Sequence, residues 1–227
     1  MIKAVIFDMY ETLITLFESP LYMAKQICAD VGISEPVFRE IWDVTDEDRT
    51  LGKKTLEEVI EAILRKNARY SEELFETVIE KRKRSRAECF EHLHPGIIPM
   101  LSAIKQKNIK IGLITNCYFE ESEAIRGSLL FRYFDAVCMS CELGMKKPDP
   151  GIFQECIKAL AVAPEECLYV GDGGSGELEA ALAMGMNPVQ AVWYLKEGTT
   201  QPVGRKEGFL HMESPMDIVG GIEKYNE

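Results

Sequence analysis

From about residue 93 onward, short apolar runs alternate with segments whose apolar residues recur at helical spacing. Runs of this length without polar interruption are typical of strands buried on both faces. Strands that alternate with helices predict a parallel sheet covered by helices, because each crossover connection is itself a helix. A further apolar run near the N-terminus supplies one more strand. The expected strands are Ala4–Phe7, Ile109–Ile114, Ala136–Met139, Leu168–Val170 and Pro188–Trp193, and the expected core helices are Pro99–Lys107, Glu120–Leu130, Pro150–Leu160 and Glu177–Met184.

Residues 16–92 break this alternation, because they contain no convincing strand pattern. Thr55 with Glu58 three positions later has the form of a capping box, which marks the start of a helix. We therefore expect an all-helical domain inserted after the first strand, with residues 1–15 and 93–227 forming the α/β core domain. The expected helices of the insertion are Met23–Val31, Val37–Asp48, Thr55–Lys66 and Ser71–Arg84.

Composition and charge exclude several classes of function. A net charge of -11 over 227 residues repels nucleic acid, and no basic run is large enough to reverse that sign locally. No apolar run approaches the roughly 18 residues that span a bilayer, and the first apolar segment ends at Asp8, too soon for a signal peptide. Seven cysteines without a secretory signal indicate reduced thiols. We expect a cytoplasmic protein without nucleic-acid or membrane partners, and the sequence leaves open whether it is a monomer or a homodimer.

Polar side chains stand directly after several of the expected strands. In an open parallel sheet, ligands bind beyond the carboxyl ends of the strands, near the point where strand order reverses. An aspartate after a buried strand is costly unless its charge has a partner, so a purely structural role explains it poorly. The residues in question are Asp8, Thr115, Asn116, Lys147 and Asp172.

Four segments carry a resemblance to a known family. Phe7–Leu13 (FDMYETL), Leu113–Asn116 (LITN), Lys147–Pro150 (KPDP) and Gly171–Glu177 (GDGGSGE) resemble, in this order, the four motifs of the haloacid dehalogenase superfamily. Each segment alone is compatible with a turn or a helix cap, whereas four in the right order are not. The resemblance implies a Rossmann-like α/β core, and it identifies the helical insertion as the family's mobile cap.

The resemblance also implies roles for single residues. Asp8 corresponds to the nucleophile that forms a covalent ester with the substrate. Thr115 and Lys147, together with Asn116, correspond to the groups that bind the anionic part of the substrate, a small molecule.

In phosphatases of the superfamily, Mg²⁺ is the cofactor. Asp8, the backbone carbonyl of Tyr10 and Asp172 correspond to its protein ligands, and oxygen ligands of this kind suit magnesium. Glu177 corresponds to the second acid of the fourth motif, which holds a metal-bound water or orients the hydrolytic one.

The first motif departs from the phosphatase pattern. Family phosphatases have a second aspartate two residues after the nucleophile, where this chain has Tyr10, and a phenol is a poor proton donor near pH 7. An Asp-x-Tyr motif resembles the 2-haloacid dehalogenases, whose halide leaves without a proton, but those enzymes have a serine at the position of Asp172. They also bind the substrate with a cap arginine. Arg49, seven residues after Trp42, is the candidate here, although a surface position is the more ordinary expectation for an arginine.

Three hypotheses follow from this conflict. A magnesium-dependent phosphatase of a small phosphorylated metabolite comes first, because the metal ligands are present. A 2-haloacid dehalogenase comes second, and a catalytically weakened binding protein of the same fold comes third.

Overall fold

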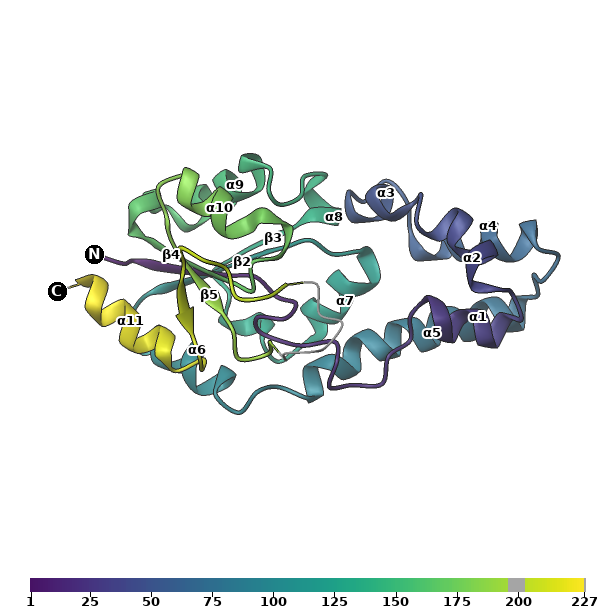
Figure 1. Ribbon diagram of the computed structural model, residues 1–227, viewed down its shortest axis with the longest axis horizontal. Helices are drawn as coiled ribbons and strands as arrows, with labels where there is room; N and C mark the ends of the chain where they lie inside the picture. The colour runs from purple at the N-terminus through teal and green to yellow at the C-terminus, as the bar shows by residue number, and fades with distance from the viewer. Residues whose placement is uncertain (196–202, 227) are drawn as a thin grey trace.

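The computed structural model describes residues 1–195 and 203–226 and contains a six-stranded, fully parallel sheet with strand order β3-β2-β1-β4-β5-β6 (Figure 1). β1 lies in the middle and pairs with both β2 and β4. Strand order therefore reverses at β1, which places the switch point beside Asp8. The strands are β1 (Ala4–Phe7), β2 (Lys110–Thr115), β3 (Ala136–Met139), β4 (Cys167–Gly171), β5 (Asn187–Ala191) and β6 (Leu210–Met212).

Helices cover both faces of the sheet, as predicted (Figure 1). The four residues of β1 are fully buried and alternate between two apolar clusters. Val5 and Phe7 pack into the cluster that includes α6 and α11, whereas Ala4 and Ile6 pack into the cluster that includes α9 and α10. The helices of this part are α6 (Ile97–Gln106), α7 (Phe119–Gly127), α8 (Ser140–Leu143), α9 (Pro150–Leu160), α10 (Glu177–Ala183) and α11 (Asp217–Asn226), with short 3₁₀ helices at Cys89–Glu91, Phe131–Tyr133, Pro164–Glu166 and Gly174–Gly176.

Five of the helices between β1 and β2, α1–α5, lie at the end of the molecule remote from both termini (Figure 1). We call α1–α5 the helical lobe. It has its own apolar cluster, separate from the two beside the sheet. Its helices are α1 (Ala24–Val31), α2 (Glu35–Trp42), α3 (Asp46–Thr50), α4 (Leu56–Lys66) and α5 (Glu72–Glu88).

The helix starts of the lobe follow their local sequence. Thr55 Oγ1 accepts a hydrogen bond from Glu58 N at 3.2 Å, and the Glu58 carboxylate accepts one from Thr55 N at 2.8 Å. This is the expected capping box, and Ser71 begins α5 by accepting from Leu74 N.

Two expectations about elements were wrong. The helix expected over Val37–Asp48 is divided, because α2 ends at Trp42 and α3 begins only at Asp46. Nor was any element expected at α8, β6 or α11. Three of the five expected strands differ from the observed ones by one or two residues at each end, which is the usual uncertainty of element boundaries. Within the described residues, no helix is long and apolar enough to cross a membrane.

Candidate active site

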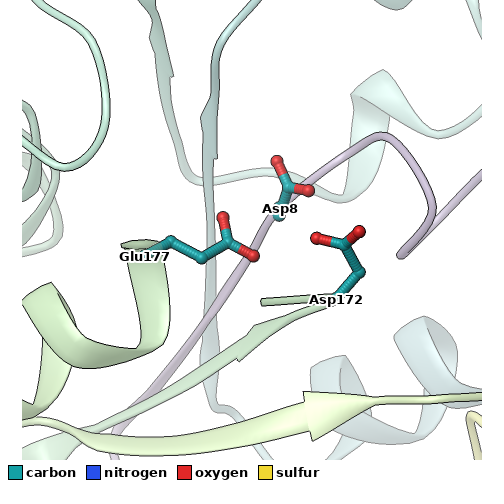
Figure 2. A group of neighbouring side chains, drawn as sticks. All are labelled: Asp8, Asp172 and Glu177. Atoms are coloured by element: carbon teal, nitrogen blue, oxygen red, sulfur yellow. The ribbon is translucent and has the colours of Figure 1, made fainter. Parts of the chain in front are cut away.

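Three carboxylates, those of Asp8, Asp172 and Glu177, meet at the carboxyl edge of the sheet (Figure 2). Asp8 follows β1, Asp172 follows β4, and Glu177 is the first residue of α10. One oxygen from each residue lies within 4.8 Å of the others, and all three side chains are buried. Adjacent parallel strands end side by side, so residues about 165 positions apart in sequence become neighbours at this edge.

Lys147 binds two of these carboxylates. Its Nζ lies 2.5 Å from Asp8 Oδ1 and also contacts Glu177 Oε2. Glu177 additionally accepts hydrogen bonds from the Tyr169 hydroxyl at 2.9 Å and from Gly173 N at 3.2 Å. Glu177 is therefore firmly fixed, and its main partner is the lysine.

The protein environment disfavours the ionised form of these carboxylates. Burial raises the pKa of Asp8 to about 7 against the opposing charge of Lys147, and burial together with the charge of Asp8 raises the pKa of Asp172 to about 6. Although burial opposes it, the charges of Asp8 and Glu177 raise the pKa of Lys147, which stays protonated. Three carboxylates around one ammonium leave an excess of negative charge that a divalent cation would neutralise. This donor set suits Mg²⁺, which prefers oxygen ligands.

The backbone around the acids is shaped for close approach. A Cβ on Gly171 would lie 2.0 Å from Glu177 Oε1, so only glycine fits at the end of β4 beside that carboxylate. Asp172 accepts a hydrogen bond from Gly174 N at 2.8 Å, and its own carbonyl accepts one from Gln190. The glycines of the fourth motif thus hold Asp172 and Glu177 next to each other.

The second motif contributes Thr115 and Asn116, which behave differently. Thr115 Oγ1 is buried and has no hydrogen-bond partner within residues 1–195 and 203–226, so the protein itself leaves this hydroxyl unpaired. Asn116 Oδ1 accepts from Lys147 N at 2.8 Å, and its amide donates to the Lys147 carbonyl at 3.1 Å. Asn116 lines the cavity beside Asp8, and its two hydrogen bonds hold the backbone of Lys147 in place.

The phenol of Tyr10 lies near charged residues of α5 and α7. Its hydroxyl is buried without a hydrogen-bond partner in the described part of the chain. Burial raises its pKa well above the ordinary value, and the nearby charged groups include Glu121 and Arg86. A phenol in this environment is not a proton donor at neutral pH.

Glu11 is a site residue to which the sequence analysis gave no role. It lines the cavity that contains Asp8 and Asp172, and its φ of 58° is unusual for a residue other than glycine. Its carboxylate accepts hydrogen bonds from Thr15 Oγ1 at 2.7 Å and Leu16 N at 3.0 Å, at the start of the connection to the helical lobe. The signal was available, since a glutamate directly follows Tyr10 in the first motif.

Arg49 is buried, with only 1% of its surface exposed, so the ordinary expectation of a surface arginine was wrong. Its guanidinium lies between the rings of Trp42 and Tyr118, at 3.9 and 4.4 Å from their centroids. It donates to the Trp42 carbonyl at 3.0 Å, although the helix that was expected to join the two residues is interrupted. Its Nε and Nη1 have no hydrogen-bond partner among the described residues.

Two adjoining cavities lead from the acids toward the lobe. The inner one, of about 170 Å³, contains Asp8, Glu11 and Asp172, and the outer one, of about 720 Å³, extends to Asp46 and Tyr118. Both are lined by Tyr10, Asn116, Lys147 and Ser175. A small molecule could therefore place one end beside Asp8 and the rest under the lobe.

A parallel α/β sheet with a buried acid at its switch point, a lysine on that acid and two further carboxylates defines a class of hydrolases with an aspartate at the reacting position. The chain belongs to the haloacid dehalogenase-like hydrolases, whose family model matches residues 2–185. The resemblance drawn from the four motifs is confirmed, as is the predicted fold class.

Two curated relatives are named as phosphatases. The glyceraldehyde 3-phosphate phosphatase of Methanopyrus kandleri is 27% identical over 199 residues, which are 84% of this chain and 84% of that protein. The phosphoserine phosphatase of Thermus thermophilus is 33% identical over 102 residues, which are 44% of this chain and 40% of that protein.

Solved structures show the same fold. A 2-haloacid dehalogenase from Pseudomonas syringae superposes with a TM-score of 0.70 at 20% identity, covering 99% of this chain and 100% of the other. A HAD phosphatase from Thermococcus onnurineus superposes with a TM-score of 0.62 at 22% identity, covering 97% and 99%.

Proposed function

We propose that this hydrolase is a magnesium-dependent phosphatase of a small phosphorylated metabolite, with Asp8 as nucleophile. The observation that carries the proposal is Asp172 beside Asp8, because a second buried carboxylate at this position suits a metal ion and has no use in a halide displacement. The names of the curated relatives support a phosphate ester as substrate.

In the first step, a carboxylate oxygen of Asp8 attacks phosphorus, the bond from phosphorus to the ester oxygen breaks, and the leaving group departs with the bonding electrons. Lys147 lowers the pKa of Asp8 against the effect of burial, which favours the ionised carboxylate, and it reduces the repulsion between Asp8 and the phosphate. Thr115 Oγ1 donates to a phosphoryl oxygen. Asp8, the Tyr10 carbonyl and Asp172 would hold Mg²⁺, whose positive charge would stabilise the negative charge on the phosphoryl oxygens.

In the second step, water attacks the phosphorus of the aspartyl phosphate, releasing inorganic phosphate and regenerating the Asp8 carboxylate. Glu177 orients Lys147, which it contacts directly. We regard residues 16–92, which include the helical lobe, as the cap that covers the substrate, and Arg49 as a residue that orders its inner wall.

The proposed mechanism has no efficient proton donor at position 10 for the leaving oxygen, because the raised pKa of the Tyr10 phenol makes it a poor acid. Substrates whose leaving group departs without being protonated, such as acyl or aryl phosphates, are therefore expected to react faster than alkyl phosphates.

A dehalogenase is the second candidate, and the observation that favours it is Tyr10 in the first motif. A two-panel assay separates the candidates. We expect modest, magnesium-dependent phosphate release from 4-nitrophenyl phosphate and no halide release from 2-chloropropionate. Halide release that persists when a chelator removes Mg²⁺ would show that the dehalogenase hypothesis is correct.

If neither assay shows product release but phosphate still raises the thermal unfolding temperature, the protein would instead be a binding protein. Stabilisation by ligand binding requires no catalysed reaction.

A further inference from the structure

Cys138 and Cys141 have the Cys-x-x-Cys spacing of many redox sites, but the structure separates the two side chains. Cys138 of β3 packs into the apolar cluster that includes α9 and α10, whereas Cys141 of α8 packs into the cluster that includes α6 and α11. Each of them lies beside a cysteine of another segment, Cys156 and Cys117 respectively. All seven cysteines are free thiols. The pattern in the sequence therefore corresponds to two separate cysteine pairs.

The pair formed by Cys117 and Cys141 stands at the carboxyl edge of the sheet, with its Sγ atoms 3.9 Å apart. Thr115 and Met139 are the last paired residues of β2 and β3, and each cysteine follows two residues later, so topology makes them neighbours. Ser140 also joins the two backbones, because its Oγ accepts from Cys117 N at 2.9 Å and donates to the Cys117 carbonyl at 3.2 Å. The approach of the two sulfurs is thus built into the fold.

The segment that carries Cys117 also supports the candidate active site. Asn116, directly before it, exchanges two hydrogen bonds with the backbone of Lys147. Tyr118, directly after it, donates a hydrogen bond from its hydroxyl to Asp46 of the helical lobe. A displacement of Cys117 would therefore disturb both the lysine beside the proposed nucleophile and a contact between lobe and core.

Cys141 lies where the other side of the lobe meets the core. Figure 1 shows α8, which carries Cys141, beside α3 of the helical lobe. A Cβ on Gly52, just after α3, would lie 1.8 Å from the Cys141 carbonyl oxygen, so the two backbones are in close contact. Both members of the pair are therefore connected to the lobe.

A purely structural role explains the second pair better than the first. Cys138 and Cys156 lie between β3 and α9, and in the described part of the chain neither of them lines the inner or the outer cavity. Cys117, in contrast, lines the outer cavity. A bond between Cys138 and Cys156 would leave the active-site segments where they are, whereas one between Cys117 and Cys141 would not.

The two thiols of the first pair differ in acidity. The hydrogen bond with Cys117 lowers the pKa of the Cys141 thiol from its ordinary value, although burial opposes this. The same hydrogen bond and burial raise the pKa of Cys117 well above its ordinary value. Because the thiolate is the reactive form, Cys141 is the thiol that attacks an oxidant first and Cys117 the one that follows.

We propose that Cys117 and Cys141 form a reversible disulfide that inactivates the enzyme when a peroxide oxidises it. Disulfides in compartments that keep thiols reduced are usually transient and often sense oxidants. The effect on activity rests on the proposed function, whereas formation of the bond does not. The two residues are 2% and 4% exposed, so the oxidant has to be as small as hydrogen peroxide. A molecule of this size can come beside the pair through the outer cavity.

The reaction has two steps. The Cys141 thiolate attacks one oxygen of hydrogen peroxide, the O–O bond breaks, and hydroxide leaves and takes up the proton that Cys141 released. The sulfur of Cys117 then attacks the resulting sulfenic acid, the S–O bond breaks, and water leaves with the proton of Cys117. Two thiols are oxidised by two electrons, and hydrogen peroxide is reduced to two molecules of water.

Formation of the bond requires movement, because a disulfide is about 2.0 Å long and the two sulfurs now lie 3.9 Å apart. The movement shifts Asn116 and with it the support of Lys147. Since a misplacement of about 1 Å in an active site can cost about 100-fold in rate, we expect the oxidised enzyme to be about 10- to 100-fold slower.

Peptide mapping by mass spectrometry tests the bond. After hydrogen peroxide treatment of the native wild-type protein, we expect tryptic peptide 111–126 to be joined to peptide 133–146 until dithiothreitol is added. Peptide 133–146 contains both Cys138 and Cys141, so variants identify the partner. Cys138→Ala, the matched control, should keep the cross-link and Cys141→Ala should lose it. The cross-link in Cys138→Ala identifies Cys141 even if Cys141→Ala does not fold.

Rates of phosphate release from 4-nitrophenyl phosphate before and after treatment test the effect. The wild type and Cys138→Ala should lose about 10- to 100-fold in rate and recover it with dithiothreitol, whereas Cys117→Ala and Cys141→Ala should keep their own untreated rates. The inference would be overturned by a wild type that forms no cross-link, by a cross-link through Cys138, or by a cross-linked enzyme that is fully active.

A binding measurement covers the case in which the reduced protein releases no phosphate, which would refute the proposed function alone. Calorimetric titration with inorganic phosphate should then show at least about 10-fold weaker binding to the cross-linked protein than to the reduced protein, because Lys147 is displaced. Equal affinities of the two forms would overturn the inference.

Discussion

Lys147 Nζ lies 2.5 Å from Asp8 Oδ1, although 139 positions separate the two residues in the sequence. Burial raises the pKa of Asp8 to about 7, and the ammonium acts in the opposite direction. Removing it should therefore raise the pKa of Asp8 further, so that a smaller fraction of the proposed nucleophile is ionised at a given pH. For Lys147→Met we expect turnover to fall by at least ~100-fold and the acidic limb of the pH–rate profile to move to higher pH.

Lys146→Met is the control for this prediction. Lys146 is half-exposed and pairs loosely with Glu47 at 3.5 Å, so its loss should change the profile little. If the two variants were equally impaired, the lysine of the third motif would have been assigned wrongly.

Asp8→Asn should abolish turnover and leave the fold intact. The amide cannot form the ester intermediate, yet it has the same shape, and it relieves the cost of a buried carboxylate whose pKa is already raised. We expect no measurable phosphate release and a midpoint of thermal unfolding equal to or above that of the wild type. Substantial residual activity would eliminate Asp8 as the nucleophile.

Magnesium should bind through Asp8 and Asp172 and stabilise the protein. A ligand at ten times its Kd adds about 1.4 kcal/mol to the free energy of unfolding, so millimolar Mg²⁺ should raise the thermal midpoint measurably. Asp172→Ala should lose both this shift and the heat of binding in calorimetry. Asp43→Ala, which removes an exposed acid of the helical lobe, should keep both. If Mg²⁺ did not bind to the wild-type protein, the dehalogenase hypothesis would be favoured.

The positions of Asp8, Thr115 and Asp172 at strand ends could be predicted from the sequence because topology alone brings the ends of parallel strands together. The three-residue strand β6 could not, since so short an element has no periodicity to detect. Nor could the burial of Arg49, which depends on two aromatic rings, one in the lobe and one after β2. Such contacts between distant segments leave no pattern in the local sequence.

Tyr10→Phe should stabilise the protein without reducing its activity toward 4-nitrophenyl phosphate. The hydroxyl is buried and has no hydrogen-bond partner in the part of the chain that the structure describes, so its removal recovers a desolvation cost of about 1 kcal/mol. The backbone carbonyl, which is the proposed metal ligand, is unchanged. Urea denaturation and steady-state kinetics measure the two effects.

Tyr10→Asp complements this variant, because it places a carboxylate where family phosphatases have one. We expect faster hydrolysis of alkyl phosphates in Tyr10→Asp if the carboxylate reaches the leaving oxygen, and little change for 4-nitrophenyl phosphate, whose leaving group needs no proton. A loss of activity in Tyr10→Phe would show that the phenol itself takes part in the reaction.

Gly52→Ala should disturb the contact between the helical lobe and the core. Gly52 follows α3 with a φ of +68°, and a Cβ there would lie 1.8 Å from the carbonyl oxygen of Cys141 in α8. The left-handed conformation alone costs about 1–2 kcal/mol for an alanine, and a clash with backbone cannot be relieved by a rotamer change. We expect the free energy of unfolding to fall by about 2–3 kcal/mol in urea titrations.

Gly127→Ala, on the surface of α7 with no atom within 4 Å of the added Cβ, should be neutral or stabilising by about 0.5–1 kcal/mol. Equal stability of the two variants would mean that the lobe does not pack on α8 in solution as it does in this structure.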